Sequence, residues 1–438
     1  MTGTTIRILA ASNNQDQNIA ARVVSDLETF FNRNFEFYGR QLKITYVDGN
    51  AIGSNSGNGP NCDFEYTAAR DVAKKYAPFA LTDPNANAPG CFLVGAARQK
   101  VIATSEFGWL TEKDMADNAP YLWQYPMGND LELAAEGRLI CSQLAGKPAT
   151  FSNDPTLRGQ PRKFGAFVHY GFGASTPDLG PLKAELAKCG EKIWAEGSAG
   201  LTGGQGTANA AAKLEQDTQN GMLAMRQAGV TDVVCVCNII LAATVSSAAD
   251  NQNYHPEWIV GTIGLNDWDV YVKAFWGAAE RQSLIGITHY PDQVPYSSMT
   301  LNQALTSVDP GFQVDGPFTT TAPMQELYWE LLMLASGIQM AGPHLTPTAF
   351  QQGMQAGRFP NPILPQQEGA VGFGGPGLHS MTKDAALMWW SDLAQGPYPD
   401  SSTGAWCYIG AGRRFDPFNL PKNLPLFSGK CVTSPPGS

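Results

Sequence analysis

Polar and aromatic side chains gather in the loops that follow the strand-like segments of this sequence. Asp16, Glu106 and Asp267 carry carboxylates suited to an ammonium group, and Asn85 and Asn87 precede a helix whose backbone N–H groups suit a carboxylate. Because ligands collect at the carboxyl ends of strands in open α/β sheets, we predict one binding site there. Its candidate residues are Asn14, Gln15, Asp16, Asp83, Asn85, Asn87, Thr104, Ser105, Glu106, Trp109, Tyr170, Phe172, Asn238, Asp267, Trp268 and Tyr290.

The motifs of catalysis, metal binding and cofactor binding are missing from the sequence. No HExxH, Walker A or EF-hand pattern is present. Gly171-Phe172-Gly173 follows a strand, but Thr176 stands where a dinucleotide fingerprint has its third glycine, which favours a plain βα turn. Asn55 stands at the centre of a Gly-Ser-Asn-Ser-Gly segment, where a nucleophile elbow needs a serine. We therefore expect no catalytic residue, no metal and no cofactor.

The cysteines indicate the compartment. Their even number and the lack of any CxxC pair favour four disulfides over a zinc site, with reduced buried thiols as the alternative. Cys235 and Cys237 share one side of a strand, so a direct bond would be strained, and we expect each to bond to a flanking helix, with Cys141 and Cys189 as the partners. Disulfides predict an extracytoplasmic protein, so we expect that an export signal before Met1 has been removed. The eight are Cys62, Cys91, Cys141, Cys189, Cys235, Cys237, Cys407 and Cys431.

Length and charge exclude several classes of protein. A chain of 438 residues exceeds the size of one typical core, which favours two lobes. The net charge is −10 and no dense basic block occurs, so we expect no nucleic-acid partner. No apolar run reaches the about 18 residues of a membrane helix, which leaves a lipid anchor or a membrane partner as the only contacts with a membrane.

Strand-like and helix-like segments alternate along the chain, which predicts an α/β fold with two doubly wound parallel-sheet lobes. The last part of the chain, about 80 residues, loses periodicity and reads as a long irregular C-terminal extension. Strands are predicted at residues 5–10, 42–47, 78–81, 101–104, 164–170, 192–196, 232–237, 258–262 and 284–288. Helices are predicted at residues 19–32, 64–76, 90–98, 131–144, 181–188, 208–228, 324–340 and 347–355.

Four segments in order carry a resemblance to a known family. Residues 32–48 (NRNFEFYGRQLKITYVD), 163–170, 225–237 and 342–354 resemble segments of branched-chain amino-acid receptors. Those receptors are type I periplasmic binding proteins with a Venus-flytrap shape, the solute receptors of ABC importers. The resemblance covers about residues 5–360 as an ensemble, and the tail resembles that of a long-tailed subgroup.

The resemblance implies three crossings between lobes, near residues 126, 287 and 358. Lobe I would then comprise residues 1–126 and 287–357, and lobe II residues 127–286 and 358–438 with the extension. It also implies the disulfides Cys62–Cys91 and Cys407–Cys431. In the family, the loops that correspond to residues 83–87 and 104–106 hold a ligand carboxylate, but here Asp83 and Glu106 add negative charge. We therefore expect a ligand other than an ordinary amino acid.

The resemblance predicts a monomeric, non-enzymatic extracytoplasmic receptor, in the periplasm or as a cell-surface lipoprotein. It would capture a small organic ligand, amino-acid-like or an aromatic or carboxylate compound, and deliver it to ABC permease subunits. Two other classes remain open. One is an enzyme or biosynthetic accessory protein that reuses the fold, and the other is the ligand-sensing ectodomain of a receptor.

Overall fold

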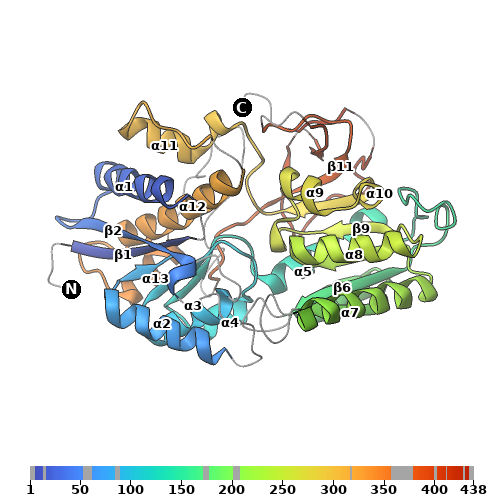
Figure 1. Ribbon diagram of the computed structural model, residues 1–438, viewed down its shortest axis with the longest axis horizontal. Coiled ribbons are helices and arrows are strands. Elements are labelled where there is room, and N and C mark those ends of the chain that lie inside the picture. The colour runs from blue at the N-terminus through green and yellow to red at the C-terminus, as the bar shows by residue number, and fades with distance from the viewer. Residues whose placement is uncertain are drawn as a thin grey trace.

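The computed structural model contains two β-sheets that lie side by side along the longest axis of the molecule, each covered by helices (Figure 1). It describes residues 5–12, 16–52, 62–83, 89–170, 177–200, 208–315, 318–356, 378–398, 402–410, 412–427 and 430–433. The predicted α/β fold with two mainly parallel sheets is confirmed. No helix within these ranges has the length and apolar character that crossing a membrane requires.

The first sheet has five parallel strands in the order β2-β1-β3-β4-β5. Side chains alternate between its faces: Ile8 packs in the same core as helix residue Leu27, whereas Leu9 packs in another core with Phe92. Both faces are therefore buried, as expected for a parallel sheet. The strands are β1 Thr5–Ser12, β2 Gln41–Asp48, β3 Ala80–Leu81, β4 Ile102–Ser105 and β5 Leu122–Gln124.

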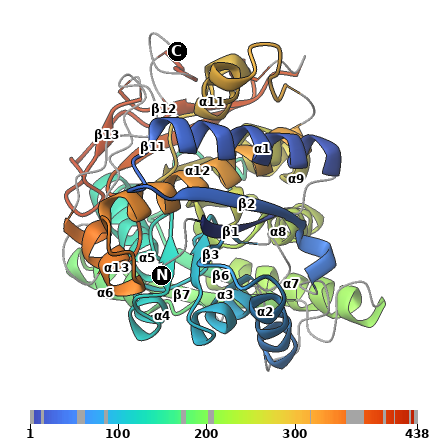
Figure 2. The same ribbon diagram turned by 90° about the vertical axis from the view of Figure 1, so that its left-hand side faces the viewer.

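Helices cover the two faces of this sheet. Helices α1 and α12 lie on one face, with α11 packed against the outer side of α1, and α2 and α3 lie on the other face (Figures 1 and 2). Helix α12 comes from much later in the chain and contacts both β1 and β4, so it lies over the centre of the sheet. The helices are α1 Gln17–Asn34, α2 Asp63–Tyr76, α3 Pro89–Arg98, α4 Glu112–Asp117, α11 Thr300–Val308, α12 Phe318–Met340 and α13 Pro347–Ala356.

The second sheet is larger and mixed, with the order β12-β11-β10-β9-β8-β6-β7 and β13 paired to β11. Its strands are β6 Phe164–Tyr170, β7 Ile193–Gly200, β8 Asp232–Val236, β9 Glu257–Val260, β10 Leu284–Thr288, β11 Ala385–Ser391, β12 Ala405–Tyr408 and β13 Arg414–Phe415. Its helices are α5 Asn129–Leu139, which continues as a π-helical turn over Ile140–Leu144, α6 Gly180–Lys188, α7 Ala208–Ala228, α8 Ile239–Asn251, α9 Asp269–Phe275 and α10 Ala278–Arg281. Short 3₁₀ turns occur at Gly49–Ile52, Ile263–Leu265 and Tyr296–Ser298.

The C-terminal extension is more regular than its composition predicts. β11 pairs antiparallel with β10, and β12 and β13 pair antiparallel with β11, so the tail extends the second sheet. The expectation of a wholly irregular extension is therefore corrected. Residues 385–391 (AALMWWS) are apolar on both faces, and such a run forms a strand when both faces are covered.

Two connections lead from one sheet to the other directly, after β5 and after β10. A third segment, residues 378–382, first runs beside β5, where Ser380 pairs with Gln124 and the Met381 N–H donates to the Gln124 carbonyl at 2.9 Å. The chain then enters the second sheet at β11. The predicted crossing near residue 358 lies outside the described residues, and the predicted lobe boundaries stay a prediction.

All eight cysteines form disulfides, but the pairing of four differs from the prediction. Cys62–Cys91 and Cys407–Cys431 form as the resemblance implied. Cys141 instead bonds to Cys189, and Cys235 bonds to Cys237. β8 ends at Val236, so the backbone turns away from the extended form, and the Cα atoms of Cys235 and Cys237 lie 5.2 Å apart, within disulfide range.

Candidate functional site

Three buried glutamates meet where the first sheet faces the second. Glu106 directly follows β4, and Glu326 and Glu330 lie one turn apart on α12. Each is at most 3% exposed, and we call these three the acidic cluster. Glu330 Oε1 accepts hydrogen bonds from Thr104 Oγ1 at 2.8 Å and from the Asp83 N–H at 3.0 Å. Strand-end loops and one helix therefore hold three carboxyl groups in one buried place.

Burial raises the pKa of every member of the acidic cluster. Burial and then the charges of Glu330 and Glu326 raise the pKa of Glu106 well above its usual value. Burial raises the pKa of Glu330 to about 8, even though hydrogen bonds from Glu106 and from the Asp83 N–H lower it. Burial, followed by the charge of Glu330, raises the pKa of Glu326. Without a cation beside them, burial therefore favours the protonated form of each group over the ionised form.

Four aromatic side chains lie beside the acidic cluster, and we call them the aromatic stack. The Trp329 ring lies parallel to Tyr125, with centroids 5.1 Å apart, and nearly parallel to Tyr290 at 5.4 Å. Trp268 contacts both Tyr290 and Trp329 at 6.4 Å. The Tyr290 hydroxyl donates to the Glu106 carbonyl, which joins the two groups directly. The stack supplies flat apolar walls with electron-rich faces.

Further carboxyl groups lie on the second-sheet side of the same region. Glu132 and Glu136 on α5 are buried, and Glu132 Oε1 accepts the Ile263 N–H at 2.8 Å. Asp267 accepts the Thr288 hydroxyl at 2.5 Å, and burial raises its pKa to about 7. Burial raises the pKa of Glu132 to about 8. The second half of the molecule therefore also presents acids to Tyr290, whose pKa is raised by burial and by their charges.

Contacts between the two halves close this region from solvent. Trp109, which follows β4, meets His169 of β6 edge-to-face with ring centroids 6.4 Å apart. His169 is 2% exposed, and burial lowers its pKa to about 4. Gly108 lies beside Ile263, because a Cβ atom added to Gly108 would lie 3.4 Å from Ile263 Cγ1, in ordinary van der Waals contact. These contacts bury the residues of the site between the two sheets.

The structure brings most of the described candidate residues together, but gives two of them local roles. Asp16 caps α1 by accepting the N–H groups of Asn18 and Ile19, and Asn238 caps α8 by accepting the Leu241 N–H at 3.0 Å. The candidates that gather between the sheets are Asp83, Thr104, Ser105, Glu106, Trp109, Asp267, Trp268 and Tyr290. Those outside the described residues are Asn14, Gln15, Asn85, Asn87 and Phe172, together with the side chain of Tyr170.

The prediction from strand-end loops missed the residues that helices contribute. Glu326, Trp329 and Glu330 come from α12, and Glu132 comes from α5. The available signal was the i, i+4 spacing of two acids within an otherwise apolar helix, because burial of such a helix also buries both carboxyl groups.

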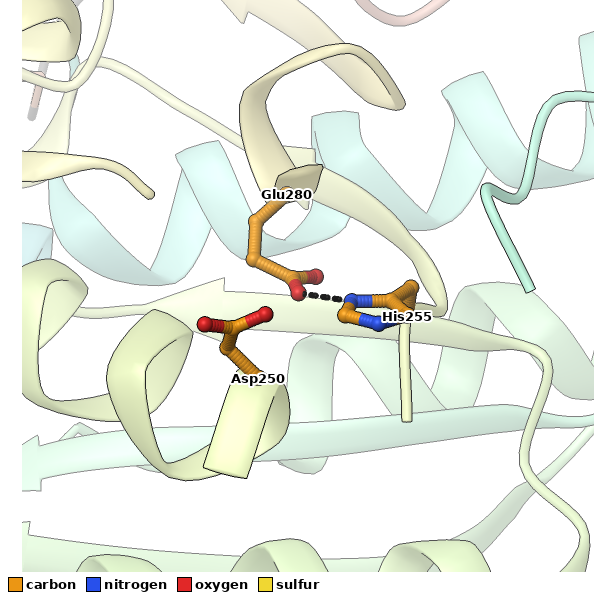
Figure 3. A group of neighbouring side chains, drawn as sticks. All are labelled: Asp250, His255 and Glu280. Atoms are coloured by element: carbon orange, nitrogen blue, oxygen red, sulfur yellow. Dashed lines mark hydrogen bonds and ion pairs between the residues drawn. The ribbon is translucent and has the colours of Figure 1, made fainter. Parts of the chain in front are cut away.

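A second group of potential ligands lies near the amino end of β9, a central strand of the second sheet. Asp250, His255 and Glu280 each place one ligand atom within 4.8 Å of the others (Figure 3). Both Glu280 oxygens are already engaged: Oε1 lies 2.5 Å from His255 Nδ1, and Oε2 accepts a hydrogen bond from Trp258 Nε1 at 2.7 Å. These bonds fix β9 against α10, so we assign this group a structural role.

The comparisons with known proteins agree on the fold. No protein-family model and no curated protein sequence matches this chain. Among solved structures, an ABC transporter substrate-binding protein from Aeropyrum pernix is similar, with a TM-score of 0.61 and 12% identity over 88% of this chain and 92% of that one.

Two further solved structures are similar to this chain. A solute-binding protein of an ABC transporter from Rhodopseudomonas palustris BisB5, in complex with 3,4-dihydroxybenzoic acid, has a TM-score of 0.59 and 10% identity over 94% of this chain and 98% of that one. A possible leucine/isoleucine/valine-binding protein from Rhodopirellula baltica SH 1 has a TM-score of 0.56 and 11% identity over 88% and 94%. The chain therefore has the type I periplasmic binding protein fold along most of its length.

Proposed function

We propose that this protein is an extracytoplasmic receptor that binds a small organic solute between its two lobes and delivers it to an ABC permease. The observation that carries the proposal is the buried group of carboxyl and aromatic side chains between the two sheets, which come from the carboxyl ends of strands and from α12. The fold supports it, because the similar solved structures are substrate-binding proteins. The four disulfides support a place outside the cytoplasm.

Buried polar atoms support a binding role for this site. Glu326 Oε1, Glu330 Oε2, the Tyr125 hydroxyl and Trp329 Nε1 have no hydrogen-bond partner among the described residues. A buried polar atom without a partner costs about 1–3 kcal/mol, so such a concentration is expected where a ligand completes the bonds. We expect the protein to act as a monomer with lobe I comprising residues 1–126 and 287–357, and lobe II the remainder.

Thermal unfolding with a library of small metabolites tests this function. A solute present at 100 times its Kd stabilises the protein by about 2.7 kcal/mol, a shift that calorimetry resolves easily. Each compound that shifts the midpoint is then incubated with the protein and recovered. Recovery of the compound in chemically unchanged form supports the receptor function. Recovery of a product, formed at a rate proportional to protein concentration, refutes the receptor and supports the enzyme alternative.

A further inference from the structure

We propose that the solute is an organic cation, an amine or guanidinium compound without a free carboxylate, held between the acidic cluster and the aromatic stack. The inference rests on the proposed receptor function and names the chemical class of its ligand. It departs from the amino acids and aromatic acids that the neighbours' descriptions mention.

The first support is the charge of the site. Glu106, Glu326 and Glu330 form no ion pair with a lysine or arginine in the described part of the chain, and the strongest influences on each are burial and other acids. The segments outside the described residues contain one basic residue by sequence, Arg358. A buried carboxylate is stable only beside a positive charge, and the described residues supply none to this site, so a cationic solute would provide the partner.

The second support comes from atoms that point to a ligand independently of charge. Glu326 Oε1 and Glu330 Oε2 are buried and have no partner in the described structure. Both carboxyl groups project from the face of α12 that also carries Trp329, because residues three and four apart lie on one side of a helix. A donor-rich group placed there meets two acceptors and an aromatic ring together.

The third support is the aromatic stack. Tyr125, Trp329 and Tyr290 lie nearly parallel to one another, and Trp268 closes the side. Faces of tryptophan and tyrosine attract organic cations, by about 2 kcal/mol or more when water is excluded. Carboxylates and aromatic faces together select a cation and reject an anion.

A metal ion fits this site less well than an organic cation. Among the described residues, Asp250, His255 and Glu280 bring three ligand atoms within 4.8 Å of one another, whereas the acidic cluster does not. Metal ligands must lie close around one centre, at about 2.0–2.6 Å from it. Carboxyl groups that do not converge on one centre suit an organic cation, which needs no such close shell of ligands.

Isothermal titration of matched compounds tests the inference at pH 8. The probes are phenethylamine and agmatine as cations, 2-phenylethanol as the neutral form, L-phenylalanine as the zwitterion, and 3-phenylpropionate and 4-hydroxybenzoate as anions. We expect at least one cation to bind, and each anion to bind at least about tenfold more weakly, which is about 1.4 kcal/mol. Preferred binding of a neutral compound, a zwitterion or an anion overturns the cation inference while leaving the receptor function intact. No binding by either cation at millimolar concentration also overturns it.

Two isosteric variants locate the effect. Glu326→Gln and Glu330→Gln each remove one charge without changing shape, and we expect each to weaken cation binding about tenfold or more, as for loss of a charge-assisted contact. Glu215→Gln, on the exposed side of α7, removes the same charge far from the site and serves as the control. Cation affinity unchanged in both cluster variants, with folding confirmed by circular dichroism, contradicts the proposal.

Discussion

At the scale of single residues, the site is dominated by carboxyl groups that are expensive to ionise. Burial without a cation raises the pKa of Glu330 to about 8, and Glu106 and Glu326 shift in the same direction. The free energy of unfolding and the occupancy of the site therefore depend on the same protons. A solute cation favours the ionised carboxylates, whereas the protein without solute favours their protonated forms.

This coupling predicts the pH dependence of stability. Glu330 and Glu132, with pKa values near 8, and Asp267, near 7, hold protons in the folded state that the unfolded chain has released. Stability contributed by these protons is fully present below the unfolded pKa and is lost as pH rises through the folded pKa. Burial lowers the pKa values of His169 and His289 to about 4. The stability that these two residues contribute therefore rises with pH up to about 6.5, in the opposite direction to that of the acids. We expect the urea midpoint to fall between pH 6.5 and 8.

Substitution of one carboxyl group tests the cause of that slope. In Glu330→Gln no proton is exchanged at this position, so the midpoint should fall less between pH 6.5 and 8 than in the unaltered protein. Glu215→Gln should leave the slope unchanged, because this side chain is exposed. A slope that is the same in all three proteins would contradict the assignment.

A close backbone approach on the second-sheet side predicts a glycine requirement. A Cβ atom on Gly261 would overlap the carboxyl oxygens of Glu132 and Glu136. We expect Gly261→Ala to displace both and to destabilise the protein by about 1–3 kcal/mol, the usual cost of overpacking, measured by urea unfolding. In the control Gly277→Ala, the nearest atom to the new Cβ lies 3.8 Å away, at Glu280. Equal losses in both variants would refute the steric argument.

At the scale of elements, segments with a clear hydrophobic period could be predicted, whereas very short strands and the strands that the C-terminal extension adds to the second sheet could not. The predicted strand at 284–288 and the predicted helix at 208–228 coincide with β10 and α7. The short strand β5 (residues 122–124) was not predicted, because three residues carry no measurable period. β12 lies in a segment that contains several glycines and a proline, and this local composition indicates a loop and not a strand. Its pairing depends on β11, which is a tertiary effect.

A buried ion-pair group anchors the C-terminal extension to the segment after β10. The Arg414 side chain is 3% exposed and contacts Asp292 at 3.0 Å and Asp384 at 2.9 Å, and it donates to the Tyr290 carbonyl at 2.8 Å. Removal of one partner from such a group leaves buried charges uncompensated and costs about 3–5 kcal/mol. We therefore expect Arg414→Met to lower the free energy of urea unfolding by about this amount.

The neighbouring arginine provides the matched control. Arg413 is exposed and lies 5.2 Å from the Phe415 ring, so Arg413→Met should change the unfolding free energy by less than about 1 kcal/mol. If both variants lower the unfolding free energy by the same small amount, the buried ion pairs do not hold the C-terminal extension in place. A loss confined to Arg414→Met shows that the extension is part of the folded unit.

At the scale of the whole molecule, the two-sheet architecture followed from the alternation of strands and helices, whereas the site followed only in part. Glu106 and Tyr290 were found because they lie near strand ends, where the rule for open sheets applies. Residues 287–357 were expected in lobe I, but Glu326 and Glu330 were missed because the prediction considered only the loops that follow strands and not the helix that packs beside them. The residues predicted from strand ends alone form a site of mixed polarity, whereas the carboxyl groups of α12 make the observed site acidic.

Enclosure of the site implies that solute enters only when the two halves separate. Tyr290 and Trp268 are 2% and 4% exposed, and a Cβ atom added to Gly108 of the first half would lie 3.4 Å from Ile263 Cγ1 of the second. A Gly108→Cys, Ile263→Cys double variant places two cysteines where a disulfide would hold the halves together. Hinge closure around a ligand then predicts that the oxidised double variant exchanges solute far more slowly, measured by stopped-flow tryptophan fluorescence.

Each single variant controls for the new side chain, because Gly108→Cys or Ile263→Cys alone cannot bridge the halves. Mass spectrometry first establishes that the fifth bond has formed, since the eight native cysteines are already paired. Slow exchange confined to the bridged protein supports opening between the lobes as the entry step. Exchange as fast in the bridged protein as in the single variants means that solute enters by another path, for which the rigid halves would have to provide a channel.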